Sequence, residues 1–361
     1  MVVNHKIKVL IVDDSALMRR ALKEIIMTDP RLDVVGTARD GQDAIEKVHE
    51  LNPDVVTMDI NMPVMDGLTS MQHILIDYPK MPILMVSSLT EEGAMTTFEA
   101  LELGAFDYVA KPSGTVSSNI HIVGREIIQK IKLAYENVNK KSIRDRMQRR
   151  SSSVSLRRPG AVRKPDFSKT IGLSKVVVIG ISTGGPGTLM EVLPLLPEDL
   201  KATVIIIQHM PPSFTSSFAK RLNEACRIPI KEADAGDVLQ NGRGFLARGG
   251  YQLVVRGDQG TLRLPSTPKT IFMPSINVTM ESVLEAYGGK NVVGVLMTGM
   301  GDDGADAMVK IRRAGGITIA EDESTAVVFG MPREAIERGG AEIVVPSYKV
   351  ADAIIKAVKR T

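Results

Sequence analysis

Acidic, hydroxyl and amine side chains follow a series of short apolar runs in the first third of the chain. Asp13 and Asp14 end the run IKVLIVDD, and Asp59 follows the run VVTM. Ser87 ends the run ILMVS, and Lys111 follows the run DYVA. Three carboxylates in one place repel one another unless a hard cation neutralises them, and Mg²⁺ prefers such oxygen ligands. The set predicts an acidic Mg²⁺ pocket in which an oxygen of Asp59 attacks a phosphoryl group.

The residues of this predicted pocket have two roles: some bind the metal ion and others bind the phosphate. We expect Mg²⁺ to bind to Asp14, Asp59 and the backbone carbonyl of Asn61. We expect Lys111 and Ser87 to hold the oxygens of the new phosphate. Aspartates also serve as turn and helix-cap residues, and each of them taken singly fits that structural role. The order acid, acid, hydroxyl and amine at four separate strand ends favours phosphoryl chemistry for the set as a whole.

The second half of the chain offers a serine, a histidine and a pair of aspartates after three further apolar runs. Ser182 lies in VVVIGISTGGPG, whose G-x-S-x-G pattern is typical of a tight turn from strand to helix. His209, the one histidine after residue 170, follows TVIIIQ, and the turn GMGDDG carries Asp302 and Asp303. A serine hydroxyl needs a base to attack an acyl carbon, and the base needs a carboxylate to orient it. The set indicates serine hydrolase chemistry, and chemistry alone does not distinguish the two aspartates.

Two other interpretations of the glycine-rich turn are weaker. A phosphate-binding loop would use the same helix N-terminus, but a dinucleotide fingerprint needs a glycine at position 182 and an acidic residue about 20 residues later. The chain has Ser182 there, followed by Gln208 and His209. An α/β-hydrolase would place its triad in the order Ser, Asp, His, whereas the order here is Ser, His, Asp.

The elements that must position these side chains are short β-branched runs separated by amphipathic helical stretches, a pattern typical of doubly wound parallel sheets. In such sheets, ligands bind at the carboxyl ends of the strands. The first part of the chain has five predicted strands: 8–12, 34–37, 55–58, 83–86 and 108–110. A second α/β unit begins near residue 172, with predicted strands at 176–181, 204–207 and 292–297.

Length and composition agree with a protein of two or three soluble domains. The chain has 361 residues, of which 43% are hydrophobic and 24% charged. Cys226 is the single cysteine, so the chain has no internal disulfide. The apolar runs are far shorter than the ~20 residues that cross a bilayer, and the first residues lack the length of a secretory signal. We therefore expect a cytoplasmic protein with no membrane insertion.

A strongly basic segment separates the two parts. Residues 139–169 hold 11 basic and 2 acidic residues, whereas residues 1–138 have a net charge of −7 and residues 170–361 a net charge of +1. Six serines and few large apolar residues predict a solvated linker. Docking on an acidic surface, either of its own N-terminal domain or of a partner, is the alternative. Nucleic-acid binding is disfavoured because the segment lacks interleaved aromatic residues.

The motifs of the first part resemble those of a response-regulator receiver domain over residues 7–125. That resemblance implies a Mg²⁺-dependent phosphorylation site. It assigns roles in phosphorylation and switching to six residues: Asp13 and Asp14 in the acidic pocket, Asp59 as phosphoacceptor, Ser87 as switch hydroxyl, Tyr108 as switch aromatic and Lys111 as pocket lysine. It also implies that Pro112, directly after the lysine, is in the cis form.

Residues 171–361 resemble the catalytic domain of the chemotaxis protein-glutamate methylesterase. The resemblance rests on the blocks IGISTGGP, QHMPPSFT, LMTGMGDDGA and VVFGMPREAI. It implies a triad of Ser182, His209 and Asp303. It also implies that the backbone amides of Thr183 and Met300 bind the oxyanion. One departure is FMPSINVTM at residues 272–280, where the family more often has His or Arg before Pro-Ser and an Asp nearby, and it concerns substrate-side contacts.

Together, the two resemblances predict two doubly wound α/β domains, a flavodoxin-like receiver and a Rossmann-like esterase domain, joined by a basic linker. The expected boundaries are residues 7–125 for the receiver, 126–170 for a helix end and linker, and 171–361 for the catalytic domain. The implied partners are methyl-accepting chemoreceptors as substrate and a chemotaxis histidine kinase as phosphodonor. The implied reactions are hydrolysis of glutamate γ-methyl esters, without a cofactor, and deamidation of glutamines.

Regulation by phosphorylation is also implied by the resemblance. The receiver would block the esterase crevice until Asp59 is phosphorylated. Two alternatives remain at this stage. In one, the second domain binds nucleotide or nucleic acid, which its near-neutral charge disfavours. In the other, the esterase acts on a different acyl group.

Overall fold

The computed structural model describes residues 6–88, 90–111, 123–148, 175–256 and 260–360. The chain divides into two compact units, Met1–Met147 and Gln148–Thr361. Pro112 and most of the predicted linker lie outside the described residues. Helix α6, Gly124–Gln148, covers the start of the predicted linker segment. Among the described helices, none is both long and apolar enough to cross a membrane.

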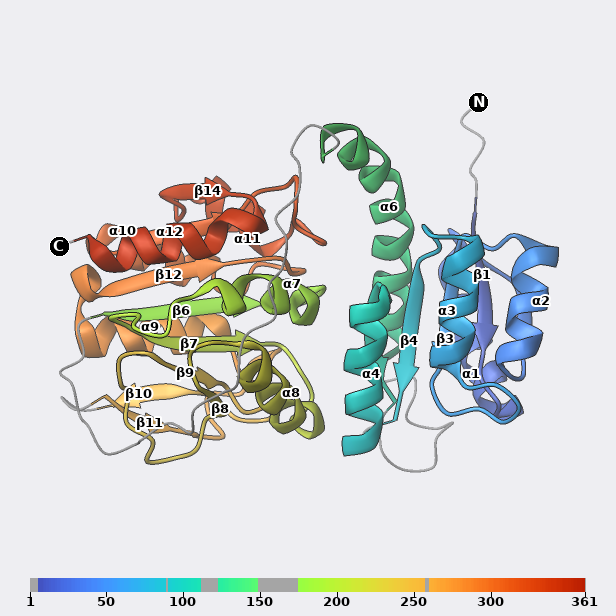
Figure 1. The fold of residues 1–361 in the computed structure, drawn as a ribbon, viewed down its shortest axis with the longest axis horizontal. Coiled ribbons are helices and arrows are strands. Elements are labelled where there is room, and N and C mark those ends of the chain that lie inside the picture. Colours follow the sequence, from blue (N-terminus) through green and yellow to red (C-terminus); the bar gives the residue numbers. More distant parts are fainter. Residues whose placement is uncertain (1–5, 89, 112–122, 149–174, 257–259, 361) are drawn as a thin grey trace. The chain divides into compact units, whose positions relative to one another are not determined.

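In its described part, the first unit is built around a five-stranded parallel sheet with the strand order β2-β1-β3-β4-β5 (Figure 1). The five strands predicted from the sequence are confirmed to within two residues at each end. Their bounds are β1 Ile7–Val12, β2 Leu32–Ala38, β3 Val55–Asp59, β4 Ile83–Ser87 and β5 Asp107–Ala110. The described helices before α6 are α1 Ala16–Ile26, α2 Gly41–Leu51, α3 Gly67–Asp77 and α4 Glu91–Leu103.

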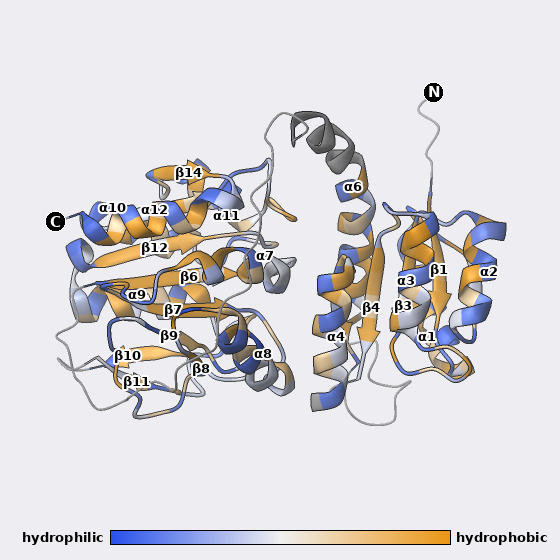
Figure 2. Ribbon diagram, in the orientation of Figure 1, coloured by the Kyte–Doolittle hydropathy of each residue, from blue (hydrophilic) through white to orange (hydrophobic). Residues whose placement is uncertain are grey.

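Local capping determines where these helices begin. The side chains of Ser15, Asp40 and Asp66 each accept a hydrogen bond from a backbone amide in the first turn of the helix that follows. Asp66 is therefore a cap. Figure 2 shows hydrophobic strands beside helices that carry hydrophilic residues on one side, as expected for a sheet covered on both faces. This arrangement leaves the carboxyl ends of the strands as the free edge of the sheet.

The second unit has a seven-stranded sheet with the order β14-β13-β12-β6-β7-β9-β8, and all its paired strands are parallel. An antiparallel pair, β10-β11, lies apart from it. The strands are β6 Val176–Ile181, β7 Thr203–Gln208, β8 Ile230–Glu232, β9 Arg243–Leu246, β10 Val254–Arg256, β11 Thr261–Arg263, β12 Val292–Leu296, β13 Ile317–Glu321 and β14 Ile343–Val345. The predicted β6, β7 and β12 are confirmed, and the other strands of this unit were not predicted.

Helices cover both faces of this sheet. Helices α9, α10 and α11 pack together in one layer, and α7 packs against α12. Their bounds are α7 Gly185–Val192, α8 Pro212–Ala225, α9 Ile276–Tyr287, α10 Ala305–Arg313, α11 Met331–Glu337 and α12 Ser347–Lys359. Because β6 pairs with β7 on one side and β12 on the other, the loops after these three strands are neighbours.

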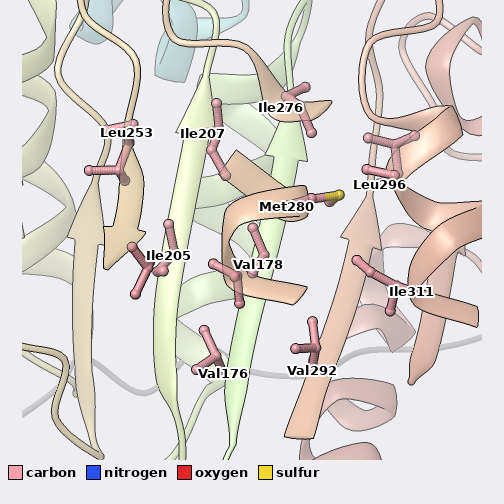
Figure 3. Close-up of a cluster of buried hydrophobic side chains, with 14 of the residues drawn as sticks. Val176, Val178, Ile205, Ile207, Leu253, Ile276, Met280, Val292, Leu296 and Ile311 are labelled. Carbon is pink, nitrogen blue, oxygen red and sulfur yellow. The ribbon is translucent and has the colours of Figure 1, made fainter. Parts of the chain in front are cut away.

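A hydrophobic core holds α9 directly below these loops. Figure 3 shows Ile276, the first residue of α9, near Leu296 and Ile207 at the carboxyl ends of β12 and β7. The packing is close, because a Cβ atom on Gly180 of β6 would lie 2.4 Å from the Ile276 side chain. A larger residue at position 180 would displace α9. The N-terminus of α9 is thereby fixed beside the carboxyl ends of the central strands.

Candidate functional site

The structure brings Ser182, His209 and Asp303 together at the carboxyl edge of the seven-stranded sheet. Ser182 directly follows β6, His209 directly follows β7, and Asp303 lies in the loop between β12 and α10. His209 Nδ1 is 3.2 Å from Ser182 Oγ. His209 Nε2 is 2.9 Å from Asp303 Oδ2. The three side chains form a continuous hydrogen-bonded chain from hydroxyl to carboxylate.

This geometry assigns the tautomer of His209. An ionised carboxylate only accepts hydrogen bonds, so the ring proton of neutral His209 resides on Nε2 and is donated to Asp303. The lone pair of Nδ1 then faces the hydroxyl of Ser182 and can accept its proton. In the Ser-His-Asp template the base is Nε2, so the two ring nitrogens have exchanged roles here. The chemistry of proton abstraction is the same.

Asp303 is held as an anion by the start of α9. Its Oδ1 accepts hydrogen bonds from Ser275 Oγ at 2.9 Å and from the Asn277 amide at 3.0 Å, and its Oδ2 accepts one from the Ile276 amide at 2.8 Å. Burial works to raise the pKa of Asp303. The hydrogen bonds from His209 and the two amides outweigh burial and hold the pKa below its ordinary value. The carboxylate is therefore ionised at neutral pH.

Its neighbour Asp302 has a different environment. The side chain of Asp302 is 61% exposed and forms a salt bridge with Arg338 at 2.7 Å. Arg338 also pairs with Asp306 and Glu334. The structure thus separates the two aspartates that chemistry alone does not distinguish, because Asp303 alone is hydrogen-bonded to His209.

Phe272 is a site residue that the sequence reasoning did not identify as such. Its ring stacks on His209 with centroids 4.1 Å apart and planes at 9°. The side chain of His209 is only 6% exposed. Stacking covers one face of the imidazole and restricts the orientation of the ring. The departure at FMPSINVTM is the sequence signal for this contact.

The backbone amides of Thr183 and Met300, which are predicted to bind the oxyanion, belong to two adjacent loops, one of which carries Ser182. Thr183 follows Ser182, and Met300 lies in the loop after β12. Within the described part of the chain, neither amide has a hydrogen-bond acceptor. The loops are in direct contact, since a Cβ atom on Gly299 would lie 2.8 Å from Ser182 Cβ. The role of the two amides as oxyanion donors stays a prediction.

Gln208 holds the loops of Ser182 and His209 together, a role that sequence reasoning missed. It is buried at the end of β7, and its Nε2 donates hydrogen bonds of 3.0 Å to the backbone carbonyls of both Ser182 and His209. One side chain therefore connects the loops that carry nucleophile and base. A glutamine at the end of an otherwise apolar strand is the signal that could have identified it.

The first unit holds the predicted acidic pocket. Oxygens of Asp13, Asp14 and Asp59 lie within 4.8 Å of one another. Lys111 Nζ is 2.9 Å from Asp13 Oδ2 and 2.8 Å from Asp59 Oδ2. Burial and the charge of Asp13 raise the pKa of Asp59 to about 6, although Lys111 opposes the shift. This crowding of carboxylates fits a divalent cation, whose charge would relieve it.

The other predicted residues of the pocket are not part of this group of contacts. Asn61 is exposed, two residues after Asp59, in the loop that leads to α3. Ser87 is fully buried, and its hydroxyl donates to the carbonyl of Gly93 in α4 at 3.2 Å. Tyr108 is buried, and its burial raises the pKa of its hydroxyl. Within the described contacts, the structure groups the three aspartates with the lysine and directs the serine toward α4.

Comparison with known proteins agrees with both units. Residues 177–354 match the family model of the CheB methylesterase, and residues 9–118 match that of the response regulator receiver domain. A protein-glutamate methylesterase/protein-glutamine glutaminase of Caldanaerobacter subterraneus subsp. tengcongensis is 51% identical over 98% of this chain and 97% of its own length. A similarly named protein of Syntrophomonas wolfei subsp. wolfei is 53% identical over 98% of this chain and 100% of its own length.

Proposed function

This chain belongs to the family of protein-glutamate methylesterases/protein-glutamine glutaminases with a receiver domain, and from this we propose that it demethylates and deamidates chemoreceptors under the control of phosphorylation. The observation that carries the proposal is the hydrogen-bonded chain Ser182–His209–Asp303. The hydroxyl, the base and the ionised carboxylate are connected in the order that serine hydrolysis needs.

The first half of the reaction forms an acyl-enzyme. Ser182 Oγ attacks the carbonyl carbon of a glutamate γ-methyl ester while His209 Nδ1 takes its proton. Asp303 stabilises the imidazolium through Nε2–H. The amides of Thr183 and Met300 bind the oxyanion of the tetrahedral intermediate, and each such donor contributes about 3 kcal/mol. His209 then returns the proton to the methoxy oxygen, and methanol leaves.

The second half of the reaction regenerates the serine. His209 takes a proton from water as the water oxygen attacks the acyl carbon. The tetrahedral intermediate collapses, the C–O bond to Ser182 breaks, and the proton returns to Ser182 Oγ. The product is a free glutamate carboxylate. With a glutamine substrate the same steps release ammonia, whose departure depends more strongly on protonation by His209.

We propose that the receiver controls this reaction through Asp59. Asp14, Asp59 and the backbone carbonyl of Asn61 would hold Mg²⁺, which when bound neutralises the carboxylates and the phosphoryl oxygens. An oxygen of Asp59 attacks the phosphorus of a phosphohistidine on the histidine kinase. The P–N bond breaks, and the histidine leaves. Lys111, already 2.8 Å from Asp59, would pair with a phosphoryl oxygen.

The switch that follows would involve Ser87 and Tyr108. The hydroxyl of Ser87 would exchange the carbonyl of Gly93 for a phosphate oxygen, which pulls on the N-terminal part of α4. The change would relieve a block by the receiver, residues 7–125, on the catalytic domain, residues 171–361, with residues 126–170 as the connecting segment.

Methanol release from methylated chemoreceptor membranes tests both halves of the proposal. We expect wild-type protein to release methanol faster with a small phosphodonor and Mg²⁺ than without. Ser182→Ala should abolish release in both conditions. Asp59→Asn should keep the slow rate and lose the stimulation. Release that persists in Ser182→Ala would exclude this site, and no release from folded wild type would direct attention to other esters.

A further inference from the structure

Thr298 joins both sides of the nucleophile turn. It is fully buried in the loop after β12. Its carbonyl accepts a hydrogen bond from the Ser182 amide at 2.9 Å. Its hydroxyl donates to the carbonyl of Thr183 at 2.9 Å and accepts from the Val328 amide at 2.9 Å. One residue thus fixes the backbone on both sides of the Ser182–Thr183 peptide bond and ties it to the segment before α11.

Thr298 is itself held by Glu321, the last residue of β13. Glu321 has no exposed surface, and its Oε2 accepts the Thr298 amide at 2.8 Å. Its Oε1 accepts the hydroxyl of Thr325 at 2.9 Å, which in turn accepts the amide of Ser347. Burying a glutamate is costly unless its oxygens are hydrogen-bonded, so this side chain commits its buried oxygens to fixing the loop.

These contacts hold the backbone segments that carry the two predicted oxyanion donors. The Thr183 amide lies on the segment bound by the hydroxyl of Thr298, and the Met300 amide lies two residues after Thr298. Gly299 lies between Thr298 and Met300, and its contact with Ser182 leaves no room for a side chain. Two donors stabilise an oxyanion only when both are directed at the same point, and small displacements reduce the rate strongly.

We propose that Thr298 and Glu321 are positioning residues that align the Thr183 and Met300 amides without touching the substrate. The inference rests on the proposed function, since it assigns these amides to the oxyanion. It predicts a loss that falls on kcat, because the two amides act on charge that develops only in the transition state. Substrate binding, which precedes that charge, is expected to change little.

The test compares Thr298→Val with Thr298→Ser in the full-length protein. Valine keeps the shape but leaves the Thr183 carbonyl and the Val328 amide without their partner. We expect kcat for methanol release to fall by roughly 10- to 100-fold with KM changed by less than about twofold. Serine keeps the hydroxyl and should restore kcat to within about threefold of wild type. Glu321→Met should lower kcat as Thr298→Val does. Glu321→Gln retains an acceptor for the Thr298 amide.

Thr318→Val provides a matched control. Thr318 is also fully buried, lies on β13 three residues before Glu321, and accepts the Glu342 amide at 3.0 Å through its hydroxyl. The Glu342 amide also reaches the Thr318 carbonyl at 3.1 Å, so Thr318→Val should lower the melting temperature less than Thr298→Val does, and it should leave kcat unchanged. If Thr298→Val does not fold, Thr298→Ala takes its place with the same expected split between kcat and KM.

Three outcomes would overturn the proposal: a folded Thr298→Val with kcat within about twofold of wild type, a Thr298→Ser as slow as Thr298→Val, or a Thr318→Val equally slow. A different result would overturn the proposed function: wild type and Ser182→Ala releasing methanol at the same rate. The two failures are therefore distinguishable in one set of measurements.

Discussion

Replacing Asp303 with asparagine tests the assignment of the carboxylate. Asp303 accepts hydrogen bonds from His209, Ser275 and two amides of α9. An asparagine side chain has one oxygen, so its NH₂ group faces a backbone N–H in either orientation. If the NH₂ replaces Oδ2, it also forces the proton of His209 onto Nδ1, where the base must be free. In both orientations the imidazolium loses its negative partner.

The expected magnitudes follow from these contacts. Loss of tautomer control and of the charge should lower kcat by a factor of about 10³, which corresponds to about 4 kcal/mol. One buried N–H of α9 without an acceptor should lower the free energy of unfolding by about 2 kcal/mol. In a domain of this size, that loss lowers the melting temperature by roughly 4–8 °C.

The assay is steady-state methanol release together with thermal unfolding, and Asp302→Asn is the control. Asp302 is exposed and pairs only at the surface with Arg338, so its loss should change kcat by less than about twofold. Asp303→Asn that keeps more than about a tenth of wild-type kcat would refute the assignment. An Asp302→Asn variant with an equally large loss of kcat would also refute the assignment.

The pH dependence of stability gives a second check on Asp303. Because the pKa of Asp303 is lowered in the folded protein, its contribution to stability is present above the ordinary value of 3.8 and is lost as pH falls through the lowered pKa. The difference in melting temperature between wild type and Asp303→Asn should therefore shrink below about pH 4. A difference that grows on acidification would contradict the stated direction of the shift.

Three further substitutions test neighbouring parts of the two sites. Gly299→Ala places a methyl group 2.8 Å from Ser182 Cβ, so kcat for methanol release should fall by about 100-fold or more, and an unchanged kcat would contradict this contact. Gln208→Leu removes the donor that braces the Ser182 carbonyl and should reduce kcat by roughly 10-fold, with a lower melting temperature in thermal unfolding. Lys111→Met removes the cation that opposes burial of Asp59, so its pKa should rise above about 6 in a metal-free NMR titration, and phosphorylation should slow; a lower pKa would contradict the pairing.

Much of the fold was determined by sequence because buried parallel strands are continuous apolar runs. The five strands of the first sheet and β6, β7 and β12 of the second have this form, and their positions were predicted to within two residues. The carboxyl ends of parallel strands share an edge, so the residues that follow these runs had to gather there. The strands β8–β11, β13 and β14 were missed because most of them mix apolar with charged or polar residues.

The tertiary structure decided which side chains meet at that edge. Asp303 rather than Asp302 reaches His209 because α9, which begins 27 residues earlier, presents its N-terminal amides on that side. Phe272 stacks on His209, and Glu321 anchors Thr298, through contacts between segments far apart in the chain. Local sequence encodes residue type and strand position, but the direction of a loop side chain depends on packing between distant elements. The residue types at the site were therefore a property of the sequence, and their partners were a property of the fold.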